Sequence, residues 1–363
     1  DSPSLPITWR RLEYCAGTNE YVQIDPRMKQ HVLDYYREQP EQARRQFGDE
    51  PFELRNVLDR WVRPFDSDLH VIPTDTLYVT IDKEAVRRSG MMIAGDSIPD
   101  VMHISLKGKR AVYKSEMMMY EMLDQCNWER PLYVAVTVGK DNYGSLGNNF
   151  VQEGLAYRIT PFNTKETGKN LDTEKMYDNM MKRFRFGGLD NPDVYLDETV
   201  TRMCYTHRRM FSLLATRLMD EGKVDSAFQV VQYVDKVIPP KTLPHCYASG
   251  SMDIARVWER LGQKDKVEEI VTPVGQTASE YIEWYLSMPA KMLIANDEEC
   301  MYYMYQLHAV ADILQRIHSD KAIDVAMKLN EYNTALRTRL YGDTPVQEEE
   351  VSQPQHIPVP AEE

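Results

Sequence analysis

The sequence lacks any apolar stretch that approaches the ~18–20 residues needed to cross a membrane as a helix. Its most apolar run, residues 132–138, is short and β-branched and ends at Gly139, so it predicts a buried strand. An excess of positive charge is also absent, because 43 Lys and Arg stand against 56 Asp and Glu, a net charge of −13. Nucleic acid and anionic membrane surfaces attract basic patches, so we expect a soluble chain that binds no nucleic acid.

The motifs of common catalytic and metal sites are missing as well. The eight histidines form no H-E-x-x-H pattern and no pair four residues apart, and no G-x-S-x-G occurs. The glycine-rich loop at 139–147 has the spacing of neither a Walker loop nor a dinucleotide fingerprint. We therefore expect no catalytic residue, no metal ligand and no cofactor-binding residue in this chain.

Closely spaced cysteines are absent too. The five cysteines are odd in number and contain no C-x-x-C pair, the main signature of zinc-ribbon and thioredoxin sites. They are Cys15, Cys126, Cys204, Cys246 and Cys300. We expect buried free thiols, because free cysteine is among the residues most often buried.

What is present is the composition of a folded protein with several domains. The 363 residues are 42% hydrophobic and 27% charged, and at ~150 residues per domain they predict two or three domains. The chain begins at Asp1 without a signal-peptide pattern, so we expect a processed product or an excised fragment. The expected segments are a helical N-terminal part (1–64), a small α/β domain (65–169), a tetratricopeptide-like helical domain (170–343) and a flexible acidic, proline-rich tail (344–363).

Local patterns predict an α+β fold that is mostly helical. Strands are expected at 77–81, 102–106, 132–138 and 155–159. A helix is expected at 114–126, with Met118, Met122 and Leu123 pointing inward. In the first segment, Asp25-Pro26 opens a helix that Pro40 interrupts, and a further helix covers 52–62.

The third segment repeats one helical pattern. The first copy consists of Leu214, Ala215, Leu218, Gly222, Ala227, Val231, Val234 and Pro239, and the second, forty positions later, of Ile254, Ala255, Trp258, Gly262, Val267 and Val271. The step exceeds the ~34-residue period of tetratricopeptide repeats, so a longer loop must join the two copies. A third, less regular copy consists of Ala309, Val310, Ile313, Ala322, Ala326 and Leu329, after a capping box at 296–299 and a helix at 301–317.

We interpret the pattern as a tetratricopeptide-like antiparallel helical array, although a generic helical bundle uses the same spacing. Gly222 and Gly262 should then lie at the turn inside each helix pair. Two stretches rich in Met and Tyr, 117–120 and 301–305, are interpreted as interdomain core, with a partner-binding surface as the alternative.

Several stretches resemble one family. They are residues 130–138 (RPLYVAVTV), 150–158 (FVQEGLAYR), 175–181 (KMYDNMM) and 186–197 (FGGLDNPDVYLD), together with the helical repeat beginning at Arg208. Over about residues 70–285 the chain resembles the C-terminal soluble region of bacterial polytopic membrane glycosyltransferases akin to protein O-mannosyltransferases, of the GT-C class. In that class the membrane part engages the lipid-linked sugar donor and an early extracytoplasmic loop carries the catalytic acid, so the resemblance assigns no catalytic residue here.

The resemblance implies a non-catalytic, periplasmic or otherwise extracytoplasmic accessory domain that recognises an acceptor protein or organises the enzyme. Its partners would be a membrane-embedded part of the same polypeptide, upstream of Asp1, and an acceptor protein or peptide. The alternatives are a stand-alone periplasmic repeat-type adaptor that binds a peptide or protein, and a hydrolase or lyase without a familiar motif. A run of upstream membrane spans in the open reading frame would favour the first, and a plain signal peptide the adaptor.

Two locations are candidates for partner binding. Solenoids of helix pairs usually bind through their concave face, where Arg208, Arg217 and Arg256 flank the packing stripe and could pair with the carboxylates of an acidic peptide. The competing location is the loop at 140–149, in which Asp141, Asn142 and Tyr143 offer polar contacts to a sugar or a peptide.

Overall fold

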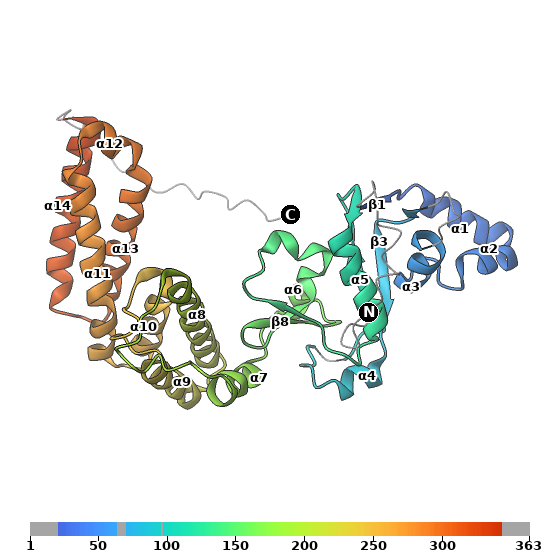
Figure 1. Cartoon of the computed structure of the whole chain (residues 1–363), viewed down its shortest axis with the longest axis horizontal. Helices are drawn as coiled ribbons and strands as arrows, with labels where there is room; N and C mark the ends of the chain where they lie inside the picture. The colour runs from blue at the N-terminus through green and yellow to red at the C-terminus, as the bar shows by residue number, and fades with distance from the viewer. Residues whose placement is uncertain (1–20, 64–69, 96, 343–363) are drawn as a thin grey trace. The chain divides into compact units, whose positions relative to one another are not determined.

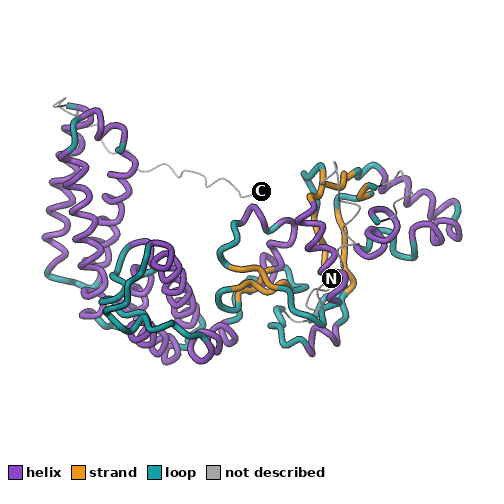
Figure 2. The backbone as a smooth tube through the Cα atoms, viewed as in Figure 1, coloured by secondary structure: helices purple, strands orange, loops and turns teal. Residues whose placement is uncertain are grey.

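The computed structural model describes residues 21–63, 70–95 and 97–342 and divides the chain into two compact units, Asp1–Arg185 and Phe186–Glu363 (Figure 1). The described strands all lie in the first unit, whereas the described part of the second is helical (Figure 2). The expected α+β, mostly helical fold is confirmed. Cys15 and the tail at 344–363 lie outside the described residues.

The described residues of the first unit form three small sheets. Their strands are β1 (Tyr21–Ile24), β2 (Val71–Ile72), β3 (Thr76–Thr80), β4 (Val101–Ser105), β5 (Ala111–Tyr113), β6 (Tyr133–Ala135), β7 (Phe150–Gln152) and β8 (Ala156–Ile159). In the first sheet, β1 pairs with β2 in parallel and with β5 antiparallel. The β3–β4 pair is antiparallel with Leu77 opposite Ile104, and β8 lies between β6 and β7 in the third sheet.

Short helices connect and cover these sheets. They are α1 (Met28–Glu38), α2 (Pro40–Phe47), α3 (Leu54–Val57), α4 (Lys83–Arg88), α5 (Lys114–Cys126), α6 (Thr164–Thr167) and α7 (Thr173–Asp178), with the π-helical turns η2 (Leu58–Val62) and η5 (Asn179–Arg183) and the 3-10 turns η3 (Lys140–Asn142) and η4 (Gly144–Asn149). Pro40 begins α2, because its fixed φ suits a first helical position. The helix expected at 52–62 is instead α3 continued by the π-helical turn η2.

One hydrophobic core joins the N-terminal helices to the sheets. Val22 of β1, Trp61 of η2 and Leu77 of β3 belong to the same cluster of buried side chains. A largely buried ion pair also links the end of η2 to α5. The guanidinium of Arg63, the residue after η2, donates to the carboxylate of Glu121 at 2.9 Å. The two compact units meet at Arg185 and Phe186, and the domain boundaries expected at 64 and 170 stay predictions.

The strand expected at 132–138 is shorter and more exposed than predicted. β6 forms an edge of its sheet, Tyr133 is 47% exposed, and the chain turns at Val136. The prediction of a buried strand is wrong because a β-branched run alone does not tell a central strand from an edge strand that has one neighbour.

Helix α5 has the expected ends but a different buried face. Met117, Tyr120 and Leu123 are buried, whereas Met118 and Met122, which were expected to point inward, are half-buried. Because residues 117–119 are all Met, the hydrophobic pattern does not specify which face of the helix is buried. The phenol of Tyr120 can be buried because its hydroxyl donates to a carboxylate one turn away, a contact that the hydrophobic pattern does not show.

The second unit consists of paired helices. They are α8 (Glu198–Asp220), α9 (Val224–Val237), α10 (Ser251–Arg260), α11 (Lys264–Ser287), α12 (Ala290–Ala295), α13 (Asp297–Arg316) and α14 (Lys321–Tyr341), with the 3-10 turn η6 (Tyr247–Ser249) before α10. α8 packs on α9, α10 on α11 and α13 on α14, and α11 also packs along α13 (Figure 1). Ala215, Ala227 and Ala255 are fully buried, and such small side chains let neighbouring helices approach closely.

The turns inside the first two pairs lie where the sequence places them. Gly222 and Gly262 have φ of +74° and +71°, so their expected position at these turns is confirmed. His318 takes the positive φ in the turn between α13 and α14. The capping box expected at 296–299 is wrong, since the Asn296 side chain donates instead to the carbonyl of Met292 in the preceding turn.

Within the described ranges, no helix combines the length and the apolar character that a membrane span requires.

Two glycines allow a matched test of the backbone of the second unit. At Gly222 an added Cβ meets open space, so alanine there should cost only the positive-φ strain, about 1–2 kcal/mol. At Gly250, with φ +78°, the Cβ would lie 2.9 Å from Cα of Arg209, so alanine should cost about 1–3 kcal/mol more. Urea unfolding monitored by circular dichroism measures the loss of unfolding free energy in each variant. Equal losses in the two variants would show that the contact between Gly250 and α8 is not tight.

Candidate functional site

A cavity of about 510 Å³ lies in the first unit where β5 and the start of α5 meet the loop at 140–149. Its volume is within the range of about 300–1,000 Å³ typical of small-molecule sites. The lining residues are Lys109, Arg110, Ala111, Tyr113, Ser115, Glu116, Met119, Asp141, Asn142 and Gly144. Two segments about thirty residues apart in the sequence thus form one site.

Glu116 holds the loop against α5. Its carboxylate accepts hydrogen bonds from Lys109 Nζ at 2.7 Å, from Tyr120 Oη at 2.6 Å and from the backbone N–H of Ser145 at 2.8 Å. Burial on its own raises the pKa of the Glu116 carboxyl group. The three hydrogen bonds together outweigh burial, and the pKa lies below its usual value. Glu116 is therefore ionised and positions the site, because its three donors come from α5, from the loop and from Lys109.

The side chains that remain for a ligand lie at the rim of this cavity. Arg110, Tyr113, Asp141 and Asn142 are exposed, and the guanidinium of Arg110 and the carboxylate of Asp141 form no ion pair with another described residue. Planar polar groups beside an aromatic ring suit a ligand with several hydroxyl or amide groups. The structure thus brings two predicted residues, Asp141 and Asn142, to one cavity.

Tyr143 does not share this location. Its half-buried ring packs against Phe150 and Tyr157, at centroid distances of 5.0 and 5.9 Å, and does not line the cavity. Sequence reasoning missed Arg110 and Tyr113. The alternation around Val112, whose side chain is buried between two outward neighbours, is a signal that could have identified Tyr113 as exposed.

Arg208 was expected to face a peptide groove, and this placement is wrong. Its side chain is 1% exposed, and its guanidinium donates to the carbonyls of Ile238, Leu243 and Pro244 at 2.5–3.2 Å. A fourth bond, 3.4 Å long, reaches Ser249 Oγ. Burial lowers the pKa of Arg208 to about 10, which leaves it charged at neutral pH. The side chain fastens the chain between α9 and α10 to α8.

The other two predicted arginines lie nearer the surface. Arg217 is half-buried on α8 and interacts with a neighbouring residue. Arg256 is exposed on α10 and forms an ion pair with Asp253 at 2.7 Å. Their role in partner binding stays a prediction, and without Arg208 the three side chains do not form one free basic stripe.

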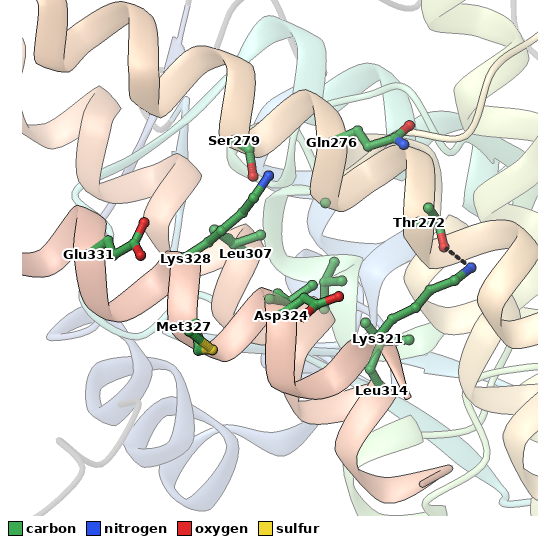
Figure 3. A pocket seen from close by; sticks show the side chains of 13 residues that line it. Thr272, Gln276, Ser279, Leu307, Leu314, Lys321, Asp324, Met327, Lys328 and Glu331 are labelled. Atoms are coloured by element: carbon green, nitrogen blue, oxygen red, sulfur yellow. Dashed lines mark hydrogen bonds between the residues drawn. The ribbon is translucent and has the colours of Figure 1, made fainter. Parts of the chain in front are cut away.

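A groove of about 530 Å³ lies in the second unit between α11 and α14, with α13 as its floor (Figure 3). Leu307, Val310 and Leu314 supply the apolar floor, and Lys321 binds Thr272 across one end at 3.3 Å. Gly275 lets α11 approach α13, because a Cβ there would lie 3.1 Å from Val310 Cγ1. None of the predicted partner-binding residues lines this groove.

Titratable groups in the described ranges do not form a metal centre, since no three His, Cys, Asp or Glu side chains are grouped to hold an ion there. Cys126, Cys204 and Cys300 are buried free thiols and Cys246 is half-buried.

The role of Arg208 can be tested by replacing its charged group. Arg208→Met keeps most of the length but leaves the buried carbonyl groups of Ile238 and Leu243, and that of the exposed Pro244, without this donor, so the free energy of unfolding should fall by about 3 kcal/mol or more. The matched control, Arg256→Met, removes an exposed ion pair and should change the free energy of unfolding by less than about 1 kcal/mol. Similar urea midpoints for the two variants would contradict a stabilising role for Arg208.

Comparison with known proteins gives one match. Residues 1–177 match the family model described as TMEM260-associated domain 2, a domain family linked to glycosyltransferases. The matched residues end within α7, so the match covers most of the first unit and ends before the second. No curated protein and no solved structure matches the chain. The match is compatible with an accessory domain of a membrane protein.

Proposed function

We propose that this chain is a non-catalytic accessory domain of a membrane glycosyltransferase, on the extracytoplasmic side, where it recognises the acceptor protein or organises the enzyme. The observation that carries the proposal is the match of residues 1–177 to a domain family linked to glycosyltransferases. The resemblance to the soluble region of GT-C enzymes akin to protein O-mannosyltransferases supports the same role. The catalytic acid and the donor site then belong to a membrane-embedded part of the same polypeptide.

The cavity beside Glu116 is the location we propose for acceptor contact. Arg110, Asp141 and Asn142 can donate to and accept from the hydroxyl groups of a sugar or the amides of a peptide, and the exposed ring of Tyr113 can pack against either. The loop needs no rearrangement to present Asp141 and Asn142, because Glu116 and Ser145 already hold it.

A stand-alone repeat-type adaptor is the second candidate. Paired helices with turns at Gly222 and Gly262 suit a tetratricopeptide-like array, and exposed rings on α11 and α13 suit a protein partner. The two candidates differ in what precedes Asp1 in the open reading frame: about a dozen membrane spans favour the accessory domain, and a plain signal peptide favours the adaptor.

The accessory role predicts that the isolated chain transfers no sugar. Incubated with a lipid-linked tritiated mannose and a mixture of secreted acceptor proteins, it should give only background labelling, whereas membranes that contain the full-length polypeptide should label acceptors. Turnover by the isolated chain, without added membrane protein, would show that it is itself catalytic.

The cavity can be tested in the full-length polypeptide. Asp141→Ala combined with Asn142→Ala removes two polar contacts and should raise the KM for the acceptor protein by about tenfold, with kcat changed less. The matched control, Glu38→Ala with Gln39→Ala, alters an exposed acid–amide pair at the C-terminal end of α1 and should leave transfer within about twofold of the native rate. Native KM in the cavity variant would place acceptor recognition elsewhere.

A further inference from the structure

Six aromatic rings form a continuous series on the second unit. Trp284 and Tyr281 lie on α11, Tyr303, Tyr302 and Tyr305 on α13, and Tyr247 on η6. Successive centroids are 6.4 Å apart for Trp284–Tyr281, 4.4 Å for Tyr281–Tyr303, 5.6 Å for Tyr303–Tyr302, 6.2 Å for Tyr302–Tyr247 and 6.1 Å for Tyr247–Tyr305. We call this series the aromatic surface.

Much of the aromatic surface is open to solvent. Tyr281, Trp284, Tyr302 and Tyr305 are between 43% and 63% exposed, and Met301 beside them is 51% exposed. Such a group of large rings is unusual on a surface that binds nothing, and Tyr and Trp are the residues most enriched in interface hot spots. The exposed rings therefore indicate an interaction surface.

The surface is held in place before any partner binds. Tyr281 and Tyr303 stack with an interplanar angle of 8°, so that rings of α11 and α13 pack directly against each other within the series. Tyr247 lies on the connection that Arg208 fastens to α8, so that the rings of η6 and α13 meet across separate elements. A partner would thus lose little affinity to the ordering of these side chains.

The segment that carries five of the six rings is acidic. Residues 276–315 contain six carboxylates, namely Glu280, Glu283, Asp297, Glu298, Glu299 and Asp312, against one lysine, Lys291. Burial, and after it the charge of Glu299, raises the pKa of Tyr285, whose ring packs against that of Trp284 at a centroid distance of 4.8 Å. Three arginines of other elements lie near these segments. Arg256 of α10, whose charge acts on Tyr247, is paired with Asp253, whereas Arg209 and Arg339 donate to the backbone carbonyls of Ala248 and Leu286.

We propose that the aromatic surface and its acidic border dock an extended segment of a partner protein that carries Lys or Arg side chains. Separate guanidinium or ammonium groups of this segment can lie over the exposed faces of Trp284 and Tyr305. Glu280 lies one helical turn before Trp284 on α11 and Glu298 lies two turns before Tyr305 on α13, so each ring has a carboxylate on its own helix face, and this combination favours cations over anions. The location differs from the cavity at Asp141, and the proposal does not depend on the glycosyltransferase assignment.

Fluorescence anisotropy with three labelled synthetic peptides tests this chemistry on the whole chain. The peptides are four repeats of Arg-Pro-Ser, of Glu-Pro-Ser and of Gln-Pro-Ser. The arginine peptide should bind about tenfold or more tighter than the other two, and its affinity should fall as salt is added. Equal affinity for all three peptides, or preference for the glutamate peptide, would overturn the proposal.

Two variants locate the binding. The double variant Trp284→Ala with Tyr305→Ala should bind the arginine peptide about tenfold more weakly than the native chain. The matched control, Ile323→Ala with Met327→Ala, removes two similarly exposed apolar side chains of α14 and should bind the peptide with native affinity. The double variant Glu280→Lys with Glu298→Lys should also bind the arginine peptide more weakly. Because this variant keeps every aromatic ring, it separates the contribution of charge from that of ring packing. Thermal melting by circular dichroism confirms that each variant is folded.

Other occupants of the surface give different results. If a second copy of the chain covers the rings, sedimentation should show a dimer that Trp284→Ala with Tyr305→Ala dissociates, and the arginine peptide should not bind the dimer. Such a dimer, or native affinity for the arginine peptide in both ring and charge variants, would overturn the docking of a basic segment here.

Discussion

The buried guanidinium of Arg208 is the constraint on which the arrangement of the second unit depends. The chain between α9 and α10 is too long for a simple turn, and it contains little hydrogen-bonded structure of its own beyond η6. Arg208 binds carbonyl groups at 238, 243 and 244, so that one side chain of α8 fixes this connection. A charge this deeply buried is tolerated because oxygen atoms surround it.

Two features follow from that anchor. Gly250 ends the connection against the backbone of α8, where a side chain has no room, and so sets where α10 begins. Tyr247, three residues earlier, is brought to Tyr302 and Tyr305 of α13. The aromatic surface is therefore a product of the connection between helix pairs as well as of the pairs themselves.

The sequence predicted features that arise from local physics. The glycines at 222 and 262 mark turns because only a residue without Cβ takes positive φ there without strain, and α5 has ends that its helical pattern defines. Features that depend on distant segments were not predictable. The exposure of β6 depends on which strands flank it, and Arg110 joins Asp141 only after β5 has paired with β1.

The dependence on distant segments also explains why the positions of the candidate site residues were only partly predicted. Arg208 appeared on a polar stripe of an amphipathic helix, where arginine is usually solvated, and nothing in its neighbours along α8 signals the carbonyl groups thirty or more positions away. Asp141 and Asn142 were proposed because their loop follows a strand, and both line the cavity, while their role in binding stays a prediction. Their cavity is completed by residues that no local motif connects to them.

Hydrogen exchange of the backbone amides at 242–254 in native chain and in Arg208→Met tests the anchoring role of Arg208 most directly. The native amides of Leu243, Ser249 and Ile254 donate within this connection and the start of α10 and should be protected. In the variant, the amides of Leu243 and Ser249 should exchange much faster while the central turns of α8 and α11 stay protected. Unchanged protection at 243 and 249 in a folded variant would contradict the claim that Arg208 fixes this connection.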